Sequence, residues 1–280
     1  MRQVKTSTIS DLISALCICA NVNLRPDIRR SIENSLKKEG NPRAKAMLRL
    51  LLENADIALA GKIPICQDTG LAVVFMDIGQ DVRIIGGSLR IAVDKGVRDG
   101  YSIGYLRKSV VCSPIVRENT NTNTPAILHT SIVAGGSIKI WVMPKGFGSE
   151  NKSSVRMLNP TDGEEAIINF VVDTVKKAGP EACPPFVLGV GIGGTFDYAA
   201  YLAKKALLRK IDKKNPDAHL SFLEKKILNK VNSLGIGPMG LGGKTTALGV
   251  NILCHPTHIA GLPVAVNVNC HAMRSAYGVI

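Results

Sequence analysis

The sequence has few aromatic residues and no apolar run long enough to span a membrane. Phe, Trp and Tyr make up 4% of the 280 residues, with a single Trp. Apolar runs such as Ala72 to Met76 are far shorter than the roughly 20 residues that a transmembrane helix needs. The sequence therefore predicts a protein that does not span a membrane.

Acidic residues are too few to balance the basic ones. The chain carries 35 Lys and Arg against 22 Asp and Glu, which gives a net charge of +13. Such a charge suits a dianionic substrate, an acidic partner or nucleic acid. The basic residues are spread through expected helices, as at 204–214 and 225–230, where a solvated face explains them. Together with the scarcity of aromatic residues, this makes a nucleic-acid-binding module the weaker explanation.

A secretory leader is not indicated either. Met1–Lys5 is basic and Leu12–Ala20 is apolar, but Asp11 stands at the edge of the apolar run and no clear cleavage site follows. Thr8 and Asp11 instead predict a capping box at the start of an amphipathic helix. We therefore expect a cytoplasmic protein.

The cysteines do not form a disulfide framework. There are seven, an odd number, and their spacing matches no such pattern. In a reducing compartment each is expected to be a small buried side chain or a metal ligand. Cys17, Cys19 and Cys112 lie in apolar or β-branched runs, which predicts core positions, and Cys254 is intermediate because His255 follows it.

Apolar periodicity predicts a mixed α/β (α+β) fold. A helical N-terminal part, about 1–62, precedes a mixed sheet with flanking helices, about 63–280, and no repeat or linker interrupts the chain. We expect a single compact domain over 1–280. The expected helices are 25–40, 41–61, 88–97, 163–178, 195–211 and 220–234. The expected strands are 71–78, 126–133, 137–143, 185–190 and 264–268, with Gly135 and Gly136 joining the second and third as a hairpin.

Two phosphate-binding patterns occur, and neither is complete. Gly189, Gly191 and Gly194 match G-x-G-x-x-G, but the second strand with its acidic end is missing. Gly243-Lys-Thr245 resembles the end of a P-loop, yet Pro238 stands where Gly is required. The glycines of 235–243 either present backbone N–H groups to an anion or form tight turns, and the sequence does not decide between these.

Cys66, Cys183 and Cys270 lie among polar or rigid residues of expected loops. Three thiolates can hold a [4Fe-4S] cluster with one iron open, whereas an electron-transfer cluster needs a fourth Cys. An open iron is a Lewis acid that can take the hydroxyl and carboxylate oxygens of a 2-hydroxy acid. Spacing alone is a weak signal, because no compact motif joins the three.

Five segments together give the chain a family resemblance. They are Ile65-Cys-Gln-Asp-Thr-Gly70, Pro144-Lys-Gly-Phe-Gly-Ser-Glu-Asn-Lys152, Leu188-Gly-Val-Gly-Ile-Gly-Gly-Thr195, Gly237-Pro-Met-Gly-Leu-Gly-Gly-Lys-Thr-Thr246 and Asn269-Cys-His-Ala-Met-Arg274. In this order, over essentially the whole chain, they resemble the α component of class I iron-sulfur fumarate hydratases, a family that includes the L-tartrate dehydratases.

The resemblance implies roles for individual positions. Cys66, Cys183 and Cys270 match the cluster ligands, and Asp68 with His258 matches the pair that handles the proton of the departing hydroxyl. Gln67, Arg107 and Gly148 match groups that contact the substrate, and Arg117 is an alternative to Arg107.

The resemblance also implies a partner. In single-chain relatives a second domain supplies the base that removes the carbon-bound proton, and this sequence shows no obvious base of that kind. We therefore expect the α subunit of a hetero-oligomer, with a separate β subunit carrying the base. The expected reaction is reversible hydration of fumarate to (S)-malate. Conversion of L-tartrate to oxaloacetate is the alternative, because no residue of the chain decides between the dicarboxylates.

Overall fold

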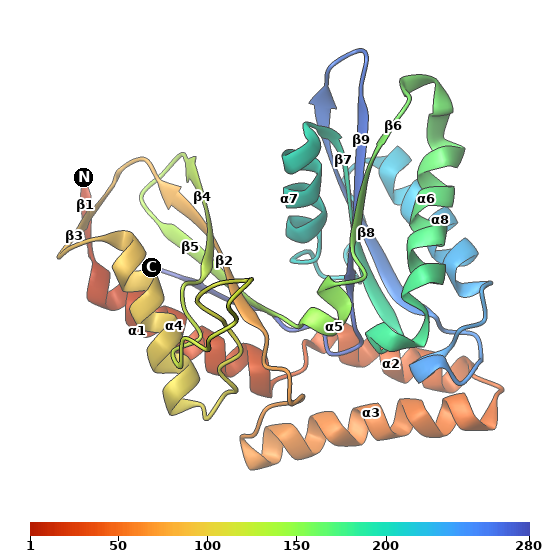
Figure 1. Ribbon diagram of the computed structural model, residues 1–280, viewed down its shortest axis with the longest axis horizontal. Coiled ribbons are helices and arrows are strands. Elements are labelled where there is room, and N and C mark those ends of the chain that lie inside the picture. Colours follow the sequence, from red (N-terminus) through yellow and green to blue (C-terminus); the bar gives the residue numbers. More distant parts are fainter. The chain divides into compact units, whose positions relative to one another are not determined.

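The computed structural model describes residues 1–280 and groups them into two compact units (Figure 1). Unit 1 consists of Met1–Arg25, Asn54–Phe147 and Arg274–Ile280, and unit 2 consists of Pro26–Glu53 and Gly148–Met273. Each unit has its own four-stranded sheet. The mixed α/β class that the sequence predicts is confirmed.

Helices and strands follow one another singly or in groups of two or three along the chain. The helices are α1 (Thr6–Val22), α2 (Pro26–Lys38), α3 (Pro42–Gly61), α4 (Leu89–Ile103), α5 (Phe147–Glu150), α6 (Gly163–Ala178), α7 (Phe196–Ala206) and α8 (Ala218–Asn232), with short 3-10 turns η1 (Pro160–Asp162), η2 (Gly179–Ala182) and η3 (Pro238–Gly240). The strands are β1 (Arg2–Lys5), β2 (Leu71–Gly79), β3 (Val82–Ile85), β4 (Ile127–Val133), β5 (Ile138–Lys145), β6 (Ser154–Leu158), β7 (Phe186–Gly194), β8 (Ala247–Thr257), β9 (Leu262–Asn269) and β10 (Ala276–Val279).

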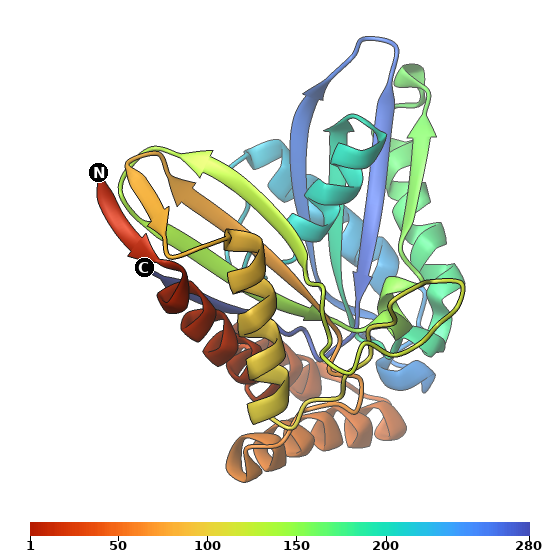
Figure 2. The same ribbon diagram turned by 60° about the vertical axis from the view of Figure 1, so that its left-hand side comes forward.

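The sheet of unit 1 has the order β10-β5-β2-β4, with α1 and α4 side by side on one of its faces (Figures 1 and 2). Ile9 and Ile13 of α1, with Val97 of α4, pack onto the inward residues of β2 and β5. The two helices approach closely because a Cβ on Gly96 would lie 2.6 Å from the carbonyl oxygen of Ser10. Removing this apolar surface from water is the main stabilisation of the unit.

The hairpin predicted from 126–133 and 137–143 is wrong. β4 pairs with β2 in parallel and β5 pairs with β2 on its other edge, so β2 lies between them. Most of β2 is buried, whereas β4 is partly exposed, so the more apolar strand takes the centre. The glycines at 135 and 136 form the turn that passes the end of β2, where the amide of Asp81 donates to the carbonyl oxygen of Gly135 at 3.1 Å.

The predicted capping box at Thr8 and Asp11 is also absent. The first helix begins two residues earlier, at Thr6, and no side chain caps it. By length and composition, the helical stretch Thr6–Lys38 is apolar enough to cross a membrane, but the buried core helix of a water-soluble protein passes the same test. Here α1 packs its apolar side chains into the core of unit 1, so the stretch is weak evidence for a membrane span.

The sheet of unit 2 has the order β6-β9-β7-β8 and is covered on both faces. Helices α6 and α8 pack against one face through the larger core of the unit, and α7 lies on the other. A Cβ on Gly189 or Gly191 would lie 2.0 Å from a carbonyl oxygen of α7. These glycines therefore allow close contact of strand and helix, which explains the G-x-G-x-x-G pattern without a phosphate.

The glycine-rich segment 235–243 forms tight turns. All five of its glycines have φ between +65° and +106°, a region that side chains rarely adopt. The next amide, that of Lys244, donates to the carboxylate of Glu39 at 2.8 Å. The carboxylate of Glu39 thus already accepts a hydrogen bond from an amide that could otherwise bind an external anion.

Candidate functional site

Asp68 lies at the centre of a hydrogen-bonded loop in unit 1. The loop of residues 65–70 connects α3 to β2, and a partly buried Asp68 points its carboxylate back to the chain. Its Oδ1 accepts a hydrogen bond from the amide of Gly70 and its Oδ2 accepts one from the amide of Phe147, both at 2.9 Å. Two backbone donors thus fix the orientation of the carboxylate.

Arg274 supports the same loop from a distant part of the chain. Its side chain is buried, and its Nη1 donates to the backbone carbonyl oxygen of Asp68 at 2.5 Å and to Oδ1 of Asn21 at 3.0 Å. There is little room for a side chain at Gly146, because an added Cβ would lie 3.1 Å from both the Asp68 carboxylate and the Arg274 guanidinium. Arg274 ends one of the five segments that carry the family resemblance, but the sequence predicted no role for it.

A second loop of unit 1 lies against the first. The hydroxyl of Thr69 donates to the carbonyl oxygen of Arg107 at 2.8 Å, and the buried amide of Asn123 donates to that of Gly70 at 3.1 Å. The side chain of Arg107 is exposed. These bonds place the backbone of Arg107 directly beside the Cys66 loop.

Arg117, the alternative to Arg107, occupies a different turn. It has a φ of +64°, and its guanidinium is directed at the carbonyl oxygen of Pro114, 3.4 Å away. No hydrogen bond joins it to the 65–70 loop in the way that Thr69 joins Arg107. Of the two arginines, Arg107 is thus the one whose backbone is hydrogen-bonded to the 65–70 loop.

Cys66 and Gln67 form a local pair in this loop. Cys66 is partly buried and Gln67 is exposed, and the thiol donates to Oε1 of Gln67 at 3.3 Å. The thiol therefore lies at the surface of unit 1, where another group can reach it.

Cys183 and Cys270 lie in unit 2, on segments that touch each other. The backbone carbonyl oxygen of Cys183 accepts a hydrogen bond from the amide of His271 at 3.3 Å and lies 3.1 Å from its Nδ1. Both thiols are partly buried. Cys183 has a left-handed backbone, with φ +55°, and such conformations in residues other than glycine cluster at functional sites.

The remaining cysteines differ from these three. Burial raises the pKa of the Cys17 thiol to about 12, as expected for a core position. Cys254 is exposed, but desolvation of its sulfur, then the nearby carboxylates of Asp217 and Glu224, raise the pKa of its thiol to about 11. Cys19 and Cys112 are exposed, so the core positions predicted for them are wrong. Cys19 lies on α1 but on its solvent side, which a continuous apolar run does not reveal.

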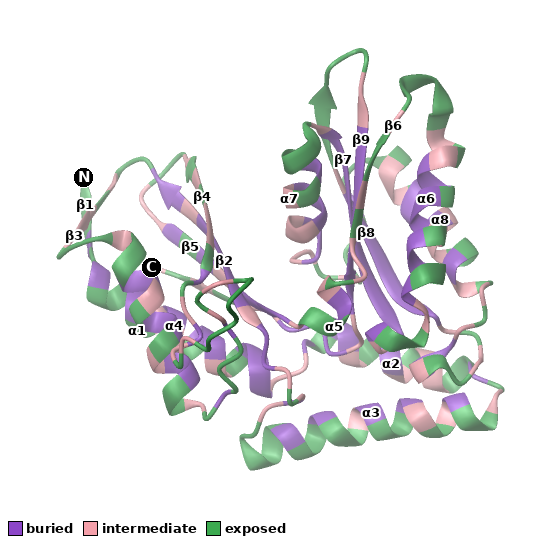
Figure 3. Ribbon diagram, viewed as in Figure 1, coloured by how far each residue is buried: buried purple, intermediate pink, exposed green.

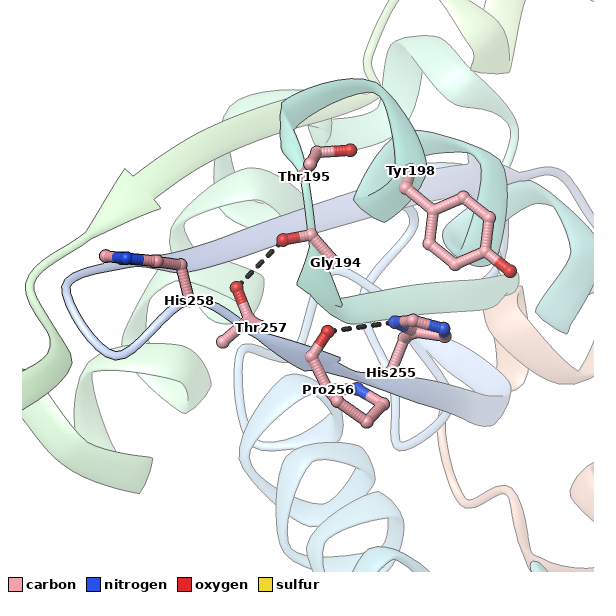
Figure 4. Close-up of a pocket in the computed structure, with 7 residues that line it drawn as sticks. All are labelled: Gly194, Thr195, Tyr198, His255, Pro256, Thr257 and His258. Atoms are coloured by element: carbon pink, nitrogen blue, oxygen red, sulfur yellow. Dashed lines mark hydrogen bonds between the residues drawn. The ribbon is translucent and has the colours of Figure 1, made fainter.

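His258 lies at the tip of the hairpin formed by β8 and β9 (Figure 4). Its side chain is exposed, and its Nδ1 accepts a hydrogen bond from the amide of Ala260 at 3.2 Å. An open hollow of about 570 Å³ lies beside it, lined by Gly194, Thr195, Tyr198, His255, Pro256, Thr257 and His258. Gly148, in the short helix α5, has open space where a side chain would be.

The donor set fits an iron-sulfur cluster in its chemistry. The three cysteines implied by the resemblance are thiols on loops, partly buried, and two of them lie on adjoining segments. No group of three or more His, Cys, Asp or Glu side chains is positioned to hold a metal ion. Cys66 belongs to unit 1, and the other two belong to unit 2.

Comparison with known proteins gives one consistent family. The family described as fumarate hydratase (Fumerase) matches residues 10–279. A relative from Methanocaldococcus jannaschii, named "Putative L(+)-tartrate dehydratase subunit alpha", is 43% identical over 275 residues, which cover 96% of each chain. The L(+)-tartrate dehydratase subunit alpha of Escherichia coli strain K12 is 26% identical over 276 residues, which cover 98% of this chain and 91% of that protein.

Proposed function

The chain belongs to the fumarate hydratase family, and on that premise we propose that it is the α subunit of a hydro-lyase that adds water to fumarate and removes it from (S)-malate. The single observation that carries the proposal is the Cys66–Gly70 loop, where a fixed carboxylate stands two residues from a surface thiol. Such a loop can present an acid–base group beside a metal centre.

We propose that Cys66, Cys183 and Cys270 hold a [4Fe-4S] cluster. When bound, the cluster supplies a Lewis acid that makes hydroxide a feasible leaving group. The adjoining segments of Cys183 and His271, and the partial burial of all three thiols, support this ligand set. The odd number of cysteines, whose spacing matches no disulfide framework, supports the proposed cytoplasmic location.

Asp68 is the group that handles the proton of the substrate hydroxyl. Its carboxylate accepts two amide N–H bonds, which hold it in one rotamer and keep its remaining lone pairs available. In this proposal the exposed guanidinium of Arg107, on the adjoining loop, binds a substrate carboxylate, for which a planar fork of donors is suited. Gln67 and the backbone at Gly148 complete the proposed substrate contacts.

L-Tartrate is the second candidate substrate, because the curated relatives bear the names of L(+)-tartrate dehydratase α subunits. The elimination is the same, with one additional hydroxyl on the substrate. The +13 charge of the chain suits either dianion.

A separate β subunit completes the enzyme in this proposal, because the chain offers no clear base for the carbon-bound proton. The word "subunit" in the names of the relatives supports such a partner.

The test is anaerobic purification of the chain alone and with its co-purifying β subunit, followed by assays on fumarate, (S)-malate and L-tartrate. We expect turnover only in the complex. Substantial turnover by the isolated chain would contradict the two-subunit proposal, and a complex inactive on all three substrates would contradict the hydro-lyase.

A further inference from the structure

We infer that Glu150 is a positioning residue of the proposed site: its carboxylate ties the turn that carries Gly148 to β9, the strand that leads into Cys270. The inference rests on the proposed function, in which the backbone at Gly148 contacts the substrate and Cys270 holds the cluster. It adds to these two groups the side chain that keeps them in place relative to each other, together with its partners Lys204 and Asn267.

Glu150 ends α5 and is part of a tightly bonded turn. The amide of Lys152 donates to the carbonyl oxygen of Ser149 at 3.1 Å, and the amide of Ser153 donates to that of Glu150 at 3.0 Å. The carboxylate therefore stands only two residues from Gly148, on a turn that its own hydrogen bonds make stiff. A contact that fixes Glu150 thus also fixes the backbone at Gly148.

Two elements of unit 2 hold the Glu150 carboxylate. The ammonium of Lys204, near the end of α7, donates to Oε1, and the side-chain amide of Asn267, on β9, donates to Oε2 at 3.0 Å. The side chains of Glu150 and Lys204 keep only 21% and 19% of their surface in solvent. Attraction between opposite charges is stronger where water is mostly excluded, so the loss of either partner costs more here than at an exposed ion pair.

The bond to Glu150 also sets the orientation of Asn267. That residue is 5% exposed, and its Oδ1 is buried without a hydrogen-bond partner. Turning the amide over would place this oxygen against the carboxylate oxygen that Nδ2 now contacts. A buried acceptor without a donor costs free energy. A cost of this kind is more typical of a functional site than of ordinary core packing.

The tie continues along β9 to Cys270. The amide of Val268 donates to Oγ of Ser153 at 3.1 Å, so the turn is bonded to two successive residues of the strand. The side-chain amide of Asn269 then donates to the carbonyl oxygen of Cys270 at 3.0 Å. Nearly all of β9 is buried (Figure 3), and it pairs with a strand on each edge. Breaking the tie would therefore let the substrate-contacting turn move relative to the cluster ligand.

Kinetics of the complex of the α and β subunits test the inference. Glu150→Gln and Lys204→Gln each remove one charge of the pair. We expect kcat/KM to fall by about 10-fold to 100-fold, as for a small misplacement at an active site. KM should account for most of the loss, because the displaced backbone binds substrate and transfers no proton. Release of iron to a chelator should also be faster, because Cys270 follows the tied strand. Lys204→Gln gives the same readouts if Glu150→Gln does not fold.

Exchanging the charges tests the tie itself. In the double variant Glu150→Lys with Lys204→Glu the ion pair is restored in reverse. Oδ1 of Asn267, which has no donor in the wild type, can then accept from the new ammonium after the amide turns over. KM and iron release should therefore return toward the wild-type values. If both stay as in the single variants, Glu150 acts through its own carboxylate and the tie is refuted.

Glu224→Gln is the matched control. Glu224 is also in unit 2, is buried, and accepts hydrogen bonds from a guanidinium and from an Asn side chain, those of Arg209 and Asn215. This variant should lose stability but keep KM and iron release, and an equal rise in KM would refute a specific role for Glu150. Wild-type KM and iron release in Glu150→Gln would overturn the positioning role alone, whereas a wild-type complex without turnover would contradict the proposed function.

Discussion

The guanidinium of Arg274 donates a hydrogen bond of 2.5 Å to the backbone carbonyl oxygen of Asp68, which precedes it by 206 positions. The same nitrogen bonds Asn21 of α1 at 3.0 Å. One buried cation thus joins the C-terminal motif, the first long helix and the loop that holds the candidate acid. Asp68 is fixed through its carboxylate by two amides and through its backbone by Arg274.

Replacing Arg274 should loosen this loop. Arg274→Lys retains the charge but loses the planar fork, and we expect unfolding free energy to fall by about 1.5–3 kcal/mol, as for a lost bond to a charged group. We expect kcat of the complex to fall more than KM changes, because the residue positions Asp68 and does not touch substrate. Urea unfolding and steady-state kinetics measure the two effects. Unchanged stability and kcat would contradict the positioning role.

Asp68→Asn tests the candidate acid itself. Loss of a positioned acid typically lowers the rate ~100-fold to 10,000-fold, so kcat should fall in that range at normal iron content. Glu39→Gln is a matched control, since Glu39 also accepts backbone N–H bonds but lies at the glycine-rich turns of unit 2. The control should lose stability and keep its kcat. A normal kcat in Asp68→Asn would show that the carboxylate only shapes the loop.

The double variant Asp68→Asn with His258→Asn should be scarcely slower than either single variant if the two residues act as one unit. Iron content must be measured in each case, because Asp68 lies two residues from Cys66. Multiplicative losses in kcat would indicate that the two residues act independently.

Serine at Cys66, Cys183 or Cys270 should each abolish the brown chromophore after anaerobic reconstitution. Cys112→Ser should keep it, because that thiol is exposed and lies outside the proposed ligand set. Absorbance and iron analysis of the folded proteins measure the result. A complete cluster in Cys183→Ser would refute the ligand assignment.

Lowering the pH should reduce the stability that Glu39 contributes through its hydrogen bonds from backbone amides. Burial raises the pKa of Glu39, but amide bonds from Asn41, Lys244 and Gly40 together hold it below its ordinary value of 4.5. A carboxyl with a lowered folded-state pKa stabilises the protein above the unfolded value, and this contribution is lost as pH falls through the folded pKa. The stability difference between wild type and Glu39→Gln should therefore shrink below pH 4.5. A constant difference in urea unfolding between pH 7 and pH 3.5 would contradict this.

Gly191→Ala should destabilise unit 2. Its Cβ would lie 2.0 Å from the carbonyl oxygen of Ala199, so α7 must move, and overpacking of this kind costs about 1–3 kcal/mol. Thermal unfolding should show the loss, and Gly148→Ala, where space is open, should show little. Equal stability of the two variants would contradict the packing role of Gly191.

The sequence predicted the helices of unit 2 and the strands β2, β7 and β9 well, because their apolar periods are long and their ends carry Gly, Pro or Asn. It gave no strand for β8, although the first half of β8 is buried. It failed at the β4–β5 connection, since strand order depends on which strand buries both faces and not on the turn between two strands. The sequence did not predict the roles of Arg274 and Thr69, because a hydrogen bond to a carbonyl oxygen far along the chain has no signature in the local sequence. Asp68, Cys66 and Cys183 were found through motifs and not through periodicity. Their roles, and that of His258, stay predictions.

The order of the segments has a consequence for truncated forms of the chain. Residues up to Met273 include all of unit 2, but unit 1 still lacks β10 and Arg274 at that point. A chain cut after Met273 would therefore leave the Asp68 loop without its buried cation. The edge of β5 that β10 covers would also be unpaired, and an open edge of this kind can pair with a strand of another molecule. Loss of residues 274–280 would thus both disturb the candidate acid site and favour aggregation.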